Sequence, residues 1–404
     1  MEKKILSLDG GGTWAVLQVM ALREIYKDVQ SVGTLCRNIL NEFDIIAANS
    51  GGSLVLAGMI EKADEDIDEV IKMFLNEELR RKIFYKLSLL DWNFERITRL
   101  FNVGPKYKAR KKIQGLENAL KKTGKIRMKE LREKLNLKPH IVLTSFDYDL
   151  KRGAFFKTEQ GDNNYDYTLA QAIDATTNAP VNFFDKPVVF NYDQNTPHQY
   201  WDGAIAGNNN PVLVGITEAL RIFDGLQRTA ETIKVLSIGN SAVLLPVDGF
   251  TASSLAVHKQ LVAPMSKSNL SGDLRRLSLS IISEPPEAAN YIAHMLLGGN
   301  ERENKPCIIR MNPMLQPVLQ QGRWQFPVGI SKEDEKDFLD LLKLELDVLK
   351  QAEMEKIVKL GNWWLTDKVV NQSIRYNGKT FQCIVGHHCF SEAKQDWLRR
   401  TLKV

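Results

Sequence analysis

The chain contains few cysteines and no long hydrophobic run. Four cysteines occur in 404 residues, at positions 36, 307, 383 and 389, which does not suggest the disulfide framework of a secreted protein. No run of 18 or more apolar residues is present, so we expect no transmembrane helix. The first predicted strand begins by Lys3, which leaves no room for a secretory signal. We therefore expect a cytoplasmic protein whose contact with a membrane is peripheral, at the inner membrane when it is active.

The chain also lacks repeats, low-complexity segments and a strong charge of either sign. Its formal net charge is +5, and this mild excess favours neither a nucleic acid nor a membrane as a partner. We expect no nucleic-acid polymer as a partner. Hydrophobic residues make up 44% and charged residues 25% of the chain, as in globular proteins. The length suits one large domain or two ordinary domains.

Strands and helices alternate in the first part of the chain. Residues 4–60 fit a strand, a helix, a second strand and a second helix. Such alternation is typical of a parallel sheet that helices cover on both faces. Further predicted strands lie at 140–146, 154–157 and 233–238, and further helices at 169–176, 212–223, 287–297 and 333–360.

A basic stretch runs from Lys106 to Lys134 within the helical, charged segment 61–138. It contains twelve Lys or Arg against three Glu. A solvated helical face accounts for such a pattern. The alternatives, which the pattern favours less, are a contact with an anionic surface and a lid over an active site.

Two glycine-rich turns each follow an apolar run. Asp9-Gly10-Gly11-Gly12 follows residues 5–8, and Ala48-Asn49-Ser50-Gly51-Gly52 follows residues 43–47. A serine at the tip of a sharp strand-to-helix turn has the geometry of a nucleophile elbow. Glycine N–H groups at a neighbouring turn are free to approach a developing oxyanion, because no Cβ stands in the way. These turns predict Ser50 as a nucleophile and Gly10, Gly11 and Gly12 as an oxyanion hole.

Other interpretations of the two turns have weaker support. The glycines also fit part of a dinucleotide-binding fingerprint, but the second strand carries no acidic residue at its end. Ser50 could also be an ordinary serine at a helix start. No familiar zinc spacing links the cysteines and histidines near the end of the chain, and we expect no cofactor and no metal.

A nucleophilic serine needs a base, and the histidines offer no clear candidate. Six histidines are present, of which His198 lies nearest to a motif. Asp202, in Trp201-Asp202-Gly203-Ala204, is the better candidate for the base. An aspartate of ordinary pKa is a weak base, so the site must remove it from water or hold its hydrogen bond short.

The chain resembles the patatin-like phospholipases through an ordered series of motifs. Asp9 to Gly12 is similar to the family's glycine-rich oxyanion motif, Asn49 to Gly52 to its serine elbow, and Asp202-Gly203-Ala204 to the motif of its catalytic aspartate. Further similar segments are 175–180, with Phe183-Phe184 after it, 209–211 and 236–239. The matches span residues 4–240. Ala48 replaces the first glycine of the elbow, and Trp14 and Ala15 stand where many members have an arginine and a glycine.

The resemblance implies an α/β fold, a patatin-like three-layer α/β/α sandwich with a mostly parallel central sheet and a helical C-terminal extension. Residues 1–250 would form the catalytic domain, and 251–404 would complete or regulate it. A Ser50–Asp202 dyad would hydrolyse carboxylic esters of membrane phospholipids. The alternative is a catalytically silent protein that keeps the fold for binding or as a scaffold.

The resemblance extends to bacterial patatin-like effectors of antiphage systems, which cyclic nucleotides switch on. It therefore implies a regulated effector with a cyclic nucleotide activator, and it is compatible with a homo-oligomer. The region after residue 250 and the basic stretch are the places where we expect such an activator site. Acyl position, head group and oligomeric state have no signal in the sequence.

Overall fold

The structure, a computed structural model, describes residues 2–86, 105–159, 167–180, 183–193, 196–247, 254–263, 285–300, 305–372, 374 and 385–402; at 191–193, 196 and 285 it describes the backbone alone. Its strands are β1 (Lys3–Leu8), β2 (Ile45–Ala48), β3 (His140–Asp147), β4 (Arg152–Lys157), β5 (Val188–Asp193), β6 (Thr196–Asp202), β7 (Ile233–Ile238), β8 (Ala242–Val243), β9 (Ile309–Met311), β10 (Met314–Leu315), β11 (Val318–Gln320) and β12 (Arg323–Gln325). Its α-helices are α1 (Val16–Tyr26), α2 (Cys36–Asn41), α3 (Ser50–Glu61), α4 (Asp68–Leu75), α5 (Glu77–Ile83), α7 (Ala109–Ala119), α8 (Leu131–Leu135), α9 (Leu169–Thr176), α10 (Val212–Ile222), α13 (Pro285–Leu296), α14 (Glu335–Leu341), α15 (Gln351–Leu365) and α16 (Phe390–Thr401). Short 3₁₀ helices are η1 (Gly12–Ala15), η2 (Met128–Glu130), η3 (Gly203–Ala206) and η4 (Lys259–Leu261).

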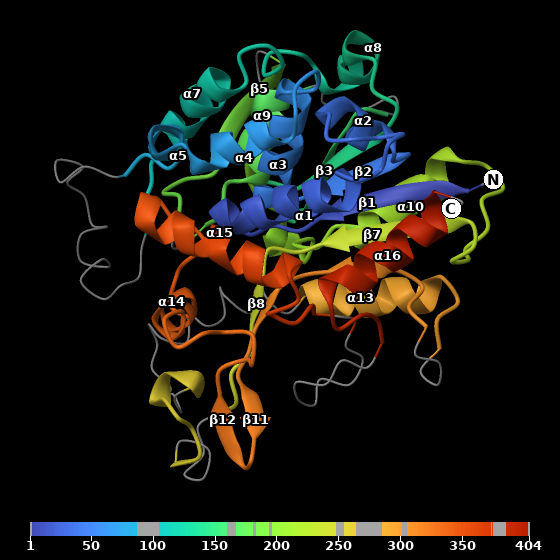
Figure 1. Ribbon diagram of the computed structural model, residues 1–404. Helices are drawn as coiled ribbons and strands as arrows, with labels where there is room; N and C mark the ends of the chain where they lie inside the picture. Colours follow the sequence, from blue (N-terminus) through green and yellow to red (C-terminus); the bar gives the residue numbers. More distant parts are fainter. Residues whose placement is uncertain are drawn as a thin grey trace.

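A mixed sheet forms the centre of the molecule (Figure 1). Within the described residues its strands follow the order β5-β6-β3-β2-β1-β7-β9, and β4 pairs with β3 outside this path. Strands β3, β2, β1, β7 and β9 run parallel to one another, while β4 and β6 run antiparallel to β3. The mostly parallel sheet is confirmed. Strand β6 was not predicted, since residues 196–202 show no clear apolar alternation.

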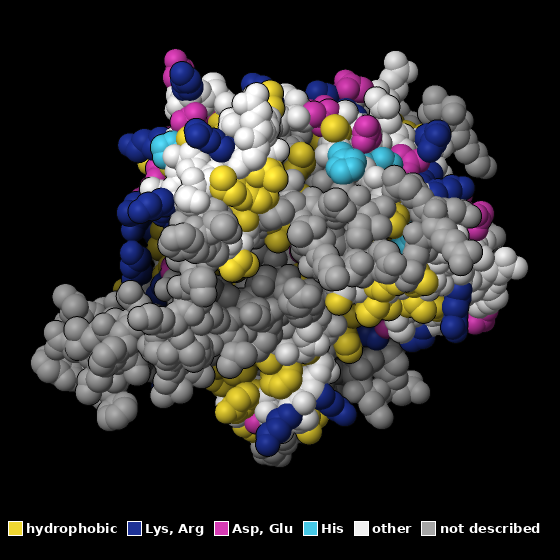
Figure 2. Space-filling view, turned by 90° about the horizontal axis from the view of Figure 1, so that it is seen from below, with side chains coloured by type: hydrophobic (Ala, Val, Ile, Leu, Met, Phe, Trp, Pro, Cys, Tyr) yellow, Lys and Arg dark blue, Asp and Glu magenta, His cyan; other side chains and the backbone are white. Residues whose placement is uncertain are grey.

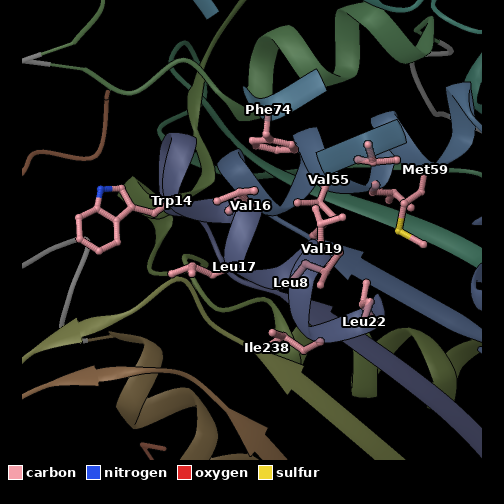
Figure 3. Packing of buried hydrophobic residues seen from close by; sticks show 14 of the residues in the cluster. Leu8, Trp14, Val16, Leu17, Val19, Leu22, Val55, Met59, Phe74 and Ile238 are labelled. Atoms are coloured by element: carbon pink, nitrogen blue, oxygen red, sulfur yellow. The ribbon is translucent and has the colours of Figure 1, made fainter. Parts of the chain in front are cut away.

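The sheet has an apolar core on each face. Neighbouring residues of a strand point to opposite faces, and on β1 Ile5 belongs to one cluster while Leu6 and Leu8 belong to the other. Helices α10 and α13 cover the face of Ile5. Helices α1, α3 and α15 cover the face of Leu8, which packs there with Val19 (Figure 3). The chain therefore forms three layers, as the resemblance implied.

The C-terminal region contributes to both the sheet and its cover. Strand β9 pairs in parallel with β7, so that Ile309 lies opposite Leu236. Helix α15 packs on α1, and on α16 the Trp397 ring stacks on Phe43 at 5.9 Å between centroids. Besides its helices this region has short strands, and β11 and β12 project below the sheet in Figure 1. A boundary at residue 250 would separate β9 from the sheet that it completes.

One predicted helix is wrong. The sequence predicted a single helix over 333–360, whereas the structure has α14 and α15 with an irregular segment between them. In that segment Leu346 accepts a hydrogen bond from the N–H of Thr13 at 2.9 Å, and Glu345 accepts one from the Trp14 indole at 2.9 Å. These bonds to the loop after β1 replace the hydrogen bonds that a continuous helix would have made.

The basic stretch is only partly a solvated face. Lys112 is fully buried, Lys106 pairs with Asp347 at 3.2 Å, and Lys122 pairs with Glu65 at 3.2 Å. Among the described residues, four cations of the stretch are exposed and have no ion-pair partner: Arg110, Lys111, Lys121 and Lys125. No helix in the described part of the chain has both the length and the apolar character needed to cross a bilayer.

Candidate active site

The two glycine-rich turns leave the same edge of the sheet. Strands β1 and β2 are parallel neighbours in which Leu8 lies opposite Ala48. The carboxyl ends of parallel strands meet at one edge, which is where α/β proteins place their sites. Asp9 and Asn49 are therefore the first residues beyond two adjacent strand ends.

Ser50 stands at a sharp and strained turn. Its φ is +46°, a left-handed backbone value that residues other than glycine seldom adopt. It is also the first residue of α3, and its N–H donates to Thr176 Oγ1 at 3.0 Å. The turn also needs the glycines after it. A Cβ on Gly52 would lie 2.4 Å from the Leu8 carbonyl oxygen, and one on Gly51 would lie 2.6 Å from the Gly12 carbonyl oxygen.

Strand β3 brings Asp202 to this serine. The first half of β3 pairs with β2, with Leu143 opposite Ala48, and its second half pairs with β6, with Ser145 opposite Asp202. Strand β4 occupies the other edge of β3 from Val142 to Asp147, opposite part of β2 and all of the β6 pairing. Strands β2 and β6 therefore share one edge of β3 and end two residues apart along it. This arrangement places the serine turn and Asp202 side by side, although 152 positions separate them in sequence.

The Asp202 carboxylate is buried and hydrogen-bonded. Only 2% of the residue is exposed. Its Oδ1 accepts from Asn49 Nδ2 at 3.0 Å and from the Ala204 N–H at 2.9 Å, and the Ser50 side chain lies near enough to the carboxylate to favour its charged form. Burial raises the pKa of Asp202, and the hydrogen bonds from Ser50, Ala204 and Asn49 oppose that rise. A raised pKa makes this aspartate a stronger base than one in water, as general-base catalysis near neutral pH requires.

The three glycines of the oxyanion loop are not equivalent. The Gly10 N–H donates to the Asn209 carbonyl at 2.8 Å, so it is engaged in the ground state. In the described part of the chain, the N–H groups of Gly11 and Gly12 have no acceptor, and neither does that of Gly51, the residue after the nucleophile. Gly12 has a φ of +58°, and a Cβ there would lie 2.3 Å from the Leu346 carbonyl oxygen. The free N–H groups next to Ser50 are thus those of Gly11, Gly12 and Gly51.

Sequence reasoning assigned no role to three polar residues that hold the site together. Asn49 Nδ2 donates both to Asp202 and to Asn209 Oδ1, the latter at 3.2 Å. Arg310, on β9, donates from Nη2 to Asp9 Oδ2 at 2.7 Å. Asn49 and Asn209 lie inside quoted motifs, which was the available signal, whereas Arg310 lies in no motif.

A cleft opens at Ser50 and Asp202. Gly11, Gly12 and Asn209 also line it. Its remaining wall is largely apolar, which suits a hydrocarbon chain better than a polar ligand. The apolar residues of this wall are Leu54, Phe84, Ala179, Phe183, Phe184, Ala204 and Leu346.

His198 lies on the same strand as Asp202 but away from the serine. It precedes Asp202 by four residues, which at ~3.3 Å per residue is about 13 Å along β6. Among the described residues, His198, Asp147 and Asp149 form the one group of side chains close enough together to hold a metal ion. Both Asp149 oxygens already accept hydrogen bonds from Gln199 at 2.9 Å. His198 is therefore not placed to act on Ser50.

Comparison with known proteins gives a family match over this part of the chain. The model of the family described as "Patatin-like phospholipase" matches residues 6–216, which include the second half of β1, all of β2 to β6 and both candidate catalytic residues. Patatin-like protein 1 of Arabidopsis thaliana is 28% identical over 225 residues, which are 53% of this chain and 50% of that protein. The chain thus spans about half the length of this curated relative.

Solved structures with some likeness are more distant. VipD from Legionella pneumophila matches with a TM-score of 0.35 and 10% identity over 92% of this chain and 68% of its own. Human GIVD cytosolic phospholipase A2, in complex with methyl gamma-linolenyl fluorophosphonate inhibitor and terbium chloride, matches with a TM-score of 0.40 and 11% identity. The match covers 90% of this chain and 57% of that structure's chain.

Proposed function

Because the chain belongs to the patatin-like phospholipase family, we propose that it is a lipid acyl hydrolase with Ser50 as nucleophile and Asp202 as base. The observation that carries this proposal is the pairing of a strained, sharply turned serine with a buried carboxylate. Ser50 is held at a φ of +46°, and its side chain lines the same cleft as Asp202, near enough to favour the charged carboxylate. A base within hydrogen-bond reach of a nucleophile is the arrangement that covalent catalysis needs.

The reaction would proceed in two halves. Asp202 accepts the Ser50 proton as the serine oxygen attacks the ester carbonyl, and the alcohol leaves with that proton. The free N–H groups of Gly11 and Gly12, with that of Gly51, stabilise the oxyanion, at ~3 kcal/mol per donor. The N–H of Gly10 supports the loop through its bond to Asn209. Water then attacks the acyl-enzyme while Asp202 again takes up a proton and returns it to Ser50.

The substrate we propose is the ester of a membrane phospholipid. The apolar wall of the cleft, with Phe183 and Phe184, would take an acyl chain. A lipid in a bilayer requires peripheral contact with the membrane. Support for such contact comes from apolar side chains exposed on the part that projects below the sheet, where β8, β11 and β12 lie (Figure 1), and Figure 2 shows patches of hydrophobic side chains from that side. The most exposed are Val247, Val257, Leu319 and Val328.

We also propose that the enzyme is a regulated bacterial effector, switched on by a cyclic nucleotide in antiphage defence. A cavity of about 520 Å³ supports an effector site, since it has the size of ordinary small-molecule sites. It lies beside the oxyanion loop at Gly10 and Gly11. Its wall combines residues from before and after position 250, among them Asn240, Arg310 and Leu346. A ligand there would contact the oxyanion loop and the C-terminal region together.

Turnover of a short-chain nitrophenyl ester tests the catalytic part. Ser50→Ala and Asp202→Asn should each lower kcat/KM by ~10³-fold or more in a folded protein. His198→Ala, the matched control on β6, should retain most activity. A folded wild-type chain that turns over no ester and no phospholipid would favour the silent scaffold, and a His198→Ala variant as inactive as Ser50→Ala would favour a triad.

Phospholipid hydrolysis with and without a panel of cyclic di- and trinucleotides tests the regulation. Low basal hydrolysis that rises strongly with one nucleotide supports it. Full phospholipase activity without any nucleotide would contradict it while leaving the dyad intact.

A further inference from the structure

Lys112 is a buried cation that lies behind the proposed catalytic aspartate. It belongs to α7 and has no exposed surface. Its ammonium donates to the Asp174 carbonyl at 2.8 Å and to Asn178 Oδ1 at 3.1 Å, and pairs with Asp174 Oδ1 at 3.3 Å. Two of the three donors of the ammonium group are thus used in hydrogen bonds, and the third contact is an ion pair. Buried ion pairs are often no more stabilising than well-packed apolar side chains, so stability alone does not account for a lysine here.

The first contact of Lys112 closes the end of α9. The Asp174 carbonyl lies in the last turn of that helix, where carbonyls have no partner within the helix. A cation at this end also complements the helix dipole. Two residues further, Thr176 Oγ1 accepts the N–H of Ser50 at 3.0 Å. Lys112 therefore holds the turn against which the nucleophile rests.

The second contact leads to Asp202. Asn178 is fully buried, and while its side chain accepts from Lys112, its carbonyl accepts the Asp202 N–H at 3.0 Å. The Asn178 amide donates to the Lys186 carbonyl at 2.9 Å, which fixes its orientation. Two hydrogen bonds thus join the Lys112 ammonium to the backbone of the base.

The same ammonium also supports the wall of the cleft. It lies 4.2 Å from the centroid of the Phe184 ring, a cation–π distance. Phe184 lines the cleft together with Ser50 and Asp202. One side chain thus contacts the supports of the nucleophile, of the base and of the apolar wall.

The charges that face Lys112 come from Asp174, on α9, and from Asp202, on β6. Helix α5 also packs on α7, but its charged side chains are engaged elsewhere. Glu77 pairs with Arg81, Glu78 pairs with Lys82, and Arg80 donates to the carbonyls of Phe74 and Leu349. In turn, the positive charge of Lys112 opposes the rise that burial causes in the pKa of Asp202.

We propose that Lys112 is a positioning residue for this active site, whose ammonium closes α9 and holds Asp202 beside Ser50 through Asn178. The inference rests on the proposed function, since it takes Asp202 as the base. It distinguishes Lys112, which is fully buried, from the other cations of the basic stretch, which are half-buried or exposed.

The test is the pH profile of kcat/KM for a nitrophenyl ester. Lys112→Met keeps the length of the side chain and removes its charge and hydrogen bonds. We expect kcat/KM of Lys112→Met to fall by ~10-fold or more, because the base is misplaced. We also expect the acid limb to move to higher pH by ~0.5–1 unit, because Asp202 loses a neighbouring positive charge. Lys111→Met, one residue away and exposed, should leave the rate and the profile unchanged.

Two further variants separate positioning from folding. Lys112→Met with Asp174→Asn removes both buried charges, so the fold should recover while the acid limb stays shifted. Lys112→Gln retains a hydrogen-bond donor, so its kcat/KM should lie between those of Lys112→Met and wild type. The acid limb of its pH profile should stay at higher pH than in wild type, because the positive charge is missing. Folded variants with wild-type rate and limb would overturn the inference. A wild-type chain without esterase activity would instead remove the proposed function, and the inference with it.

Discussion

Arg310 and Asp9 form a buried ion pair that joins the C-terminal region to the oxyanion loop. Nη2 of the arginine lies 2.7 Å from Oδ2 of the aspartate, and at most 5% of either side chain is exposed. A second nitrogen of the guanidinium donates to Ser237 Oγ at 2.9 Å. Arg310 lies on β9 and Asp9 directly after β1, with β7 between these two strands. The loop that carries Gly10 to Gly12 is therefore anchored by a residue from beyond position 300.

Removal of Arg310 should destabilise the fold. Arg310→Met leaves the Asp9 carboxylate buried without its cation, at a cost of ~3–5 kcal/mol in the free energy of unfolding. Urea unfolding measures this loss. Arg323→Met, an exposed arginine, is the control and should change little. Adding Asp9→Asn to Arg310→Met should recover much of the loss, and a double variant whose losses merely add would contradict the pairing.

The same variant should show a characteristic dependence on pH. Burial raises the pKa of Asp9, and Arg310 opposes that rise. Without the arginine, the folded pKa of Asp9 moves further above its unfolded value, so the cost of the charged carboxylate is present above the folded pKa and disappears as pH falls through it. The stability gap between wild type and Arg310→Met should therefore narrow towards low pH.

A methyl group at Gly12 should stop turnover out of proportion to its effect on stability. Gly12→Ala places a Cβ 2.3 Å from the Leu346 carbonyl oxygen and forces alanine to a φ of +58°. Displacement of this loop moves the N–H donors, and we expect kcat/KM to fall ~100-fold or more. Gly33→Ala is the matched control, because Gly33 has a φ of +67° and nothing within 4 Å of its Cβ position. Both share ~1 kcal/mol of backbone strain, and Gly12→Ala adds the cost of moving the Leu346 backbone. Equal activities of the two variants would argue against a role for this loop in the reaction.

Binding to anionic vesicles should depend on the four unpaired cations of the basic stretch. Reversal of Arg110, Lys111, Lys121 and Lys125 to glutamate should weaken binding at low salt, by ~1 kcal/mol per charge that lies near the surface. Lys112 is left out of this set because it is buried. Turnover of a soluble ester should not change. A separate variant, Leu319→Ser with Val328→Ser, should weaken binding at high salt as well if the projecting apolar side chains enter the bilayer. Unaltered binding in both variants would mean that neither surface meets the membrane.

Acid should loosen the attachment of α16 through Asp396. Burial alone would raise the pKa of this carboxyl, but hydrogen bonds from His387, Arg400 and Arg399 hold the pKa well below its usual value. A lowered folded pKa contributes stability above the unfolded pKa, near 4, and that contribution is lost as pH falls below it. Asp396→Asn should therefore lower the Tm at pH 7 and flatten its fall between pH 5 and pH 3. Glu117→Gln, at an exposed position, serves as the control and should follow the wild-type curve.

The sequence by itself determined the features that short-range sterics impose. Ser50 and the glycines beside it could be predicted, because a sharp turn between a buried strand and a buried helix excludes larger side chains. At Gly52, for example, a Cβ would collide with Leu8. The buried strands β1, β2 and β7 and the helix α9 were predictable for a similar reason, since their apolar spacing is local. Asp202 was identified from its motif rather than from any local rule.

Tertiary structure alone decided how these parts meet. Ser50 reaches Asp202 because β2 and β6 share one edge of β3, and strand pairing across more than 50 residues leaves no local pattern. Lys112 reads in the sequence like its exposed neighbour Lys111, yet the packing of α7 on α9 buries it beside Asp174. The segment between α14 and α15 has helical composition, but hydrogen bonds to Thr13 and Trp14 outweigh that preference. In each case the stabilising free energy comes from contacts between residues distant in sequence, and no local pattern shows which of them meet.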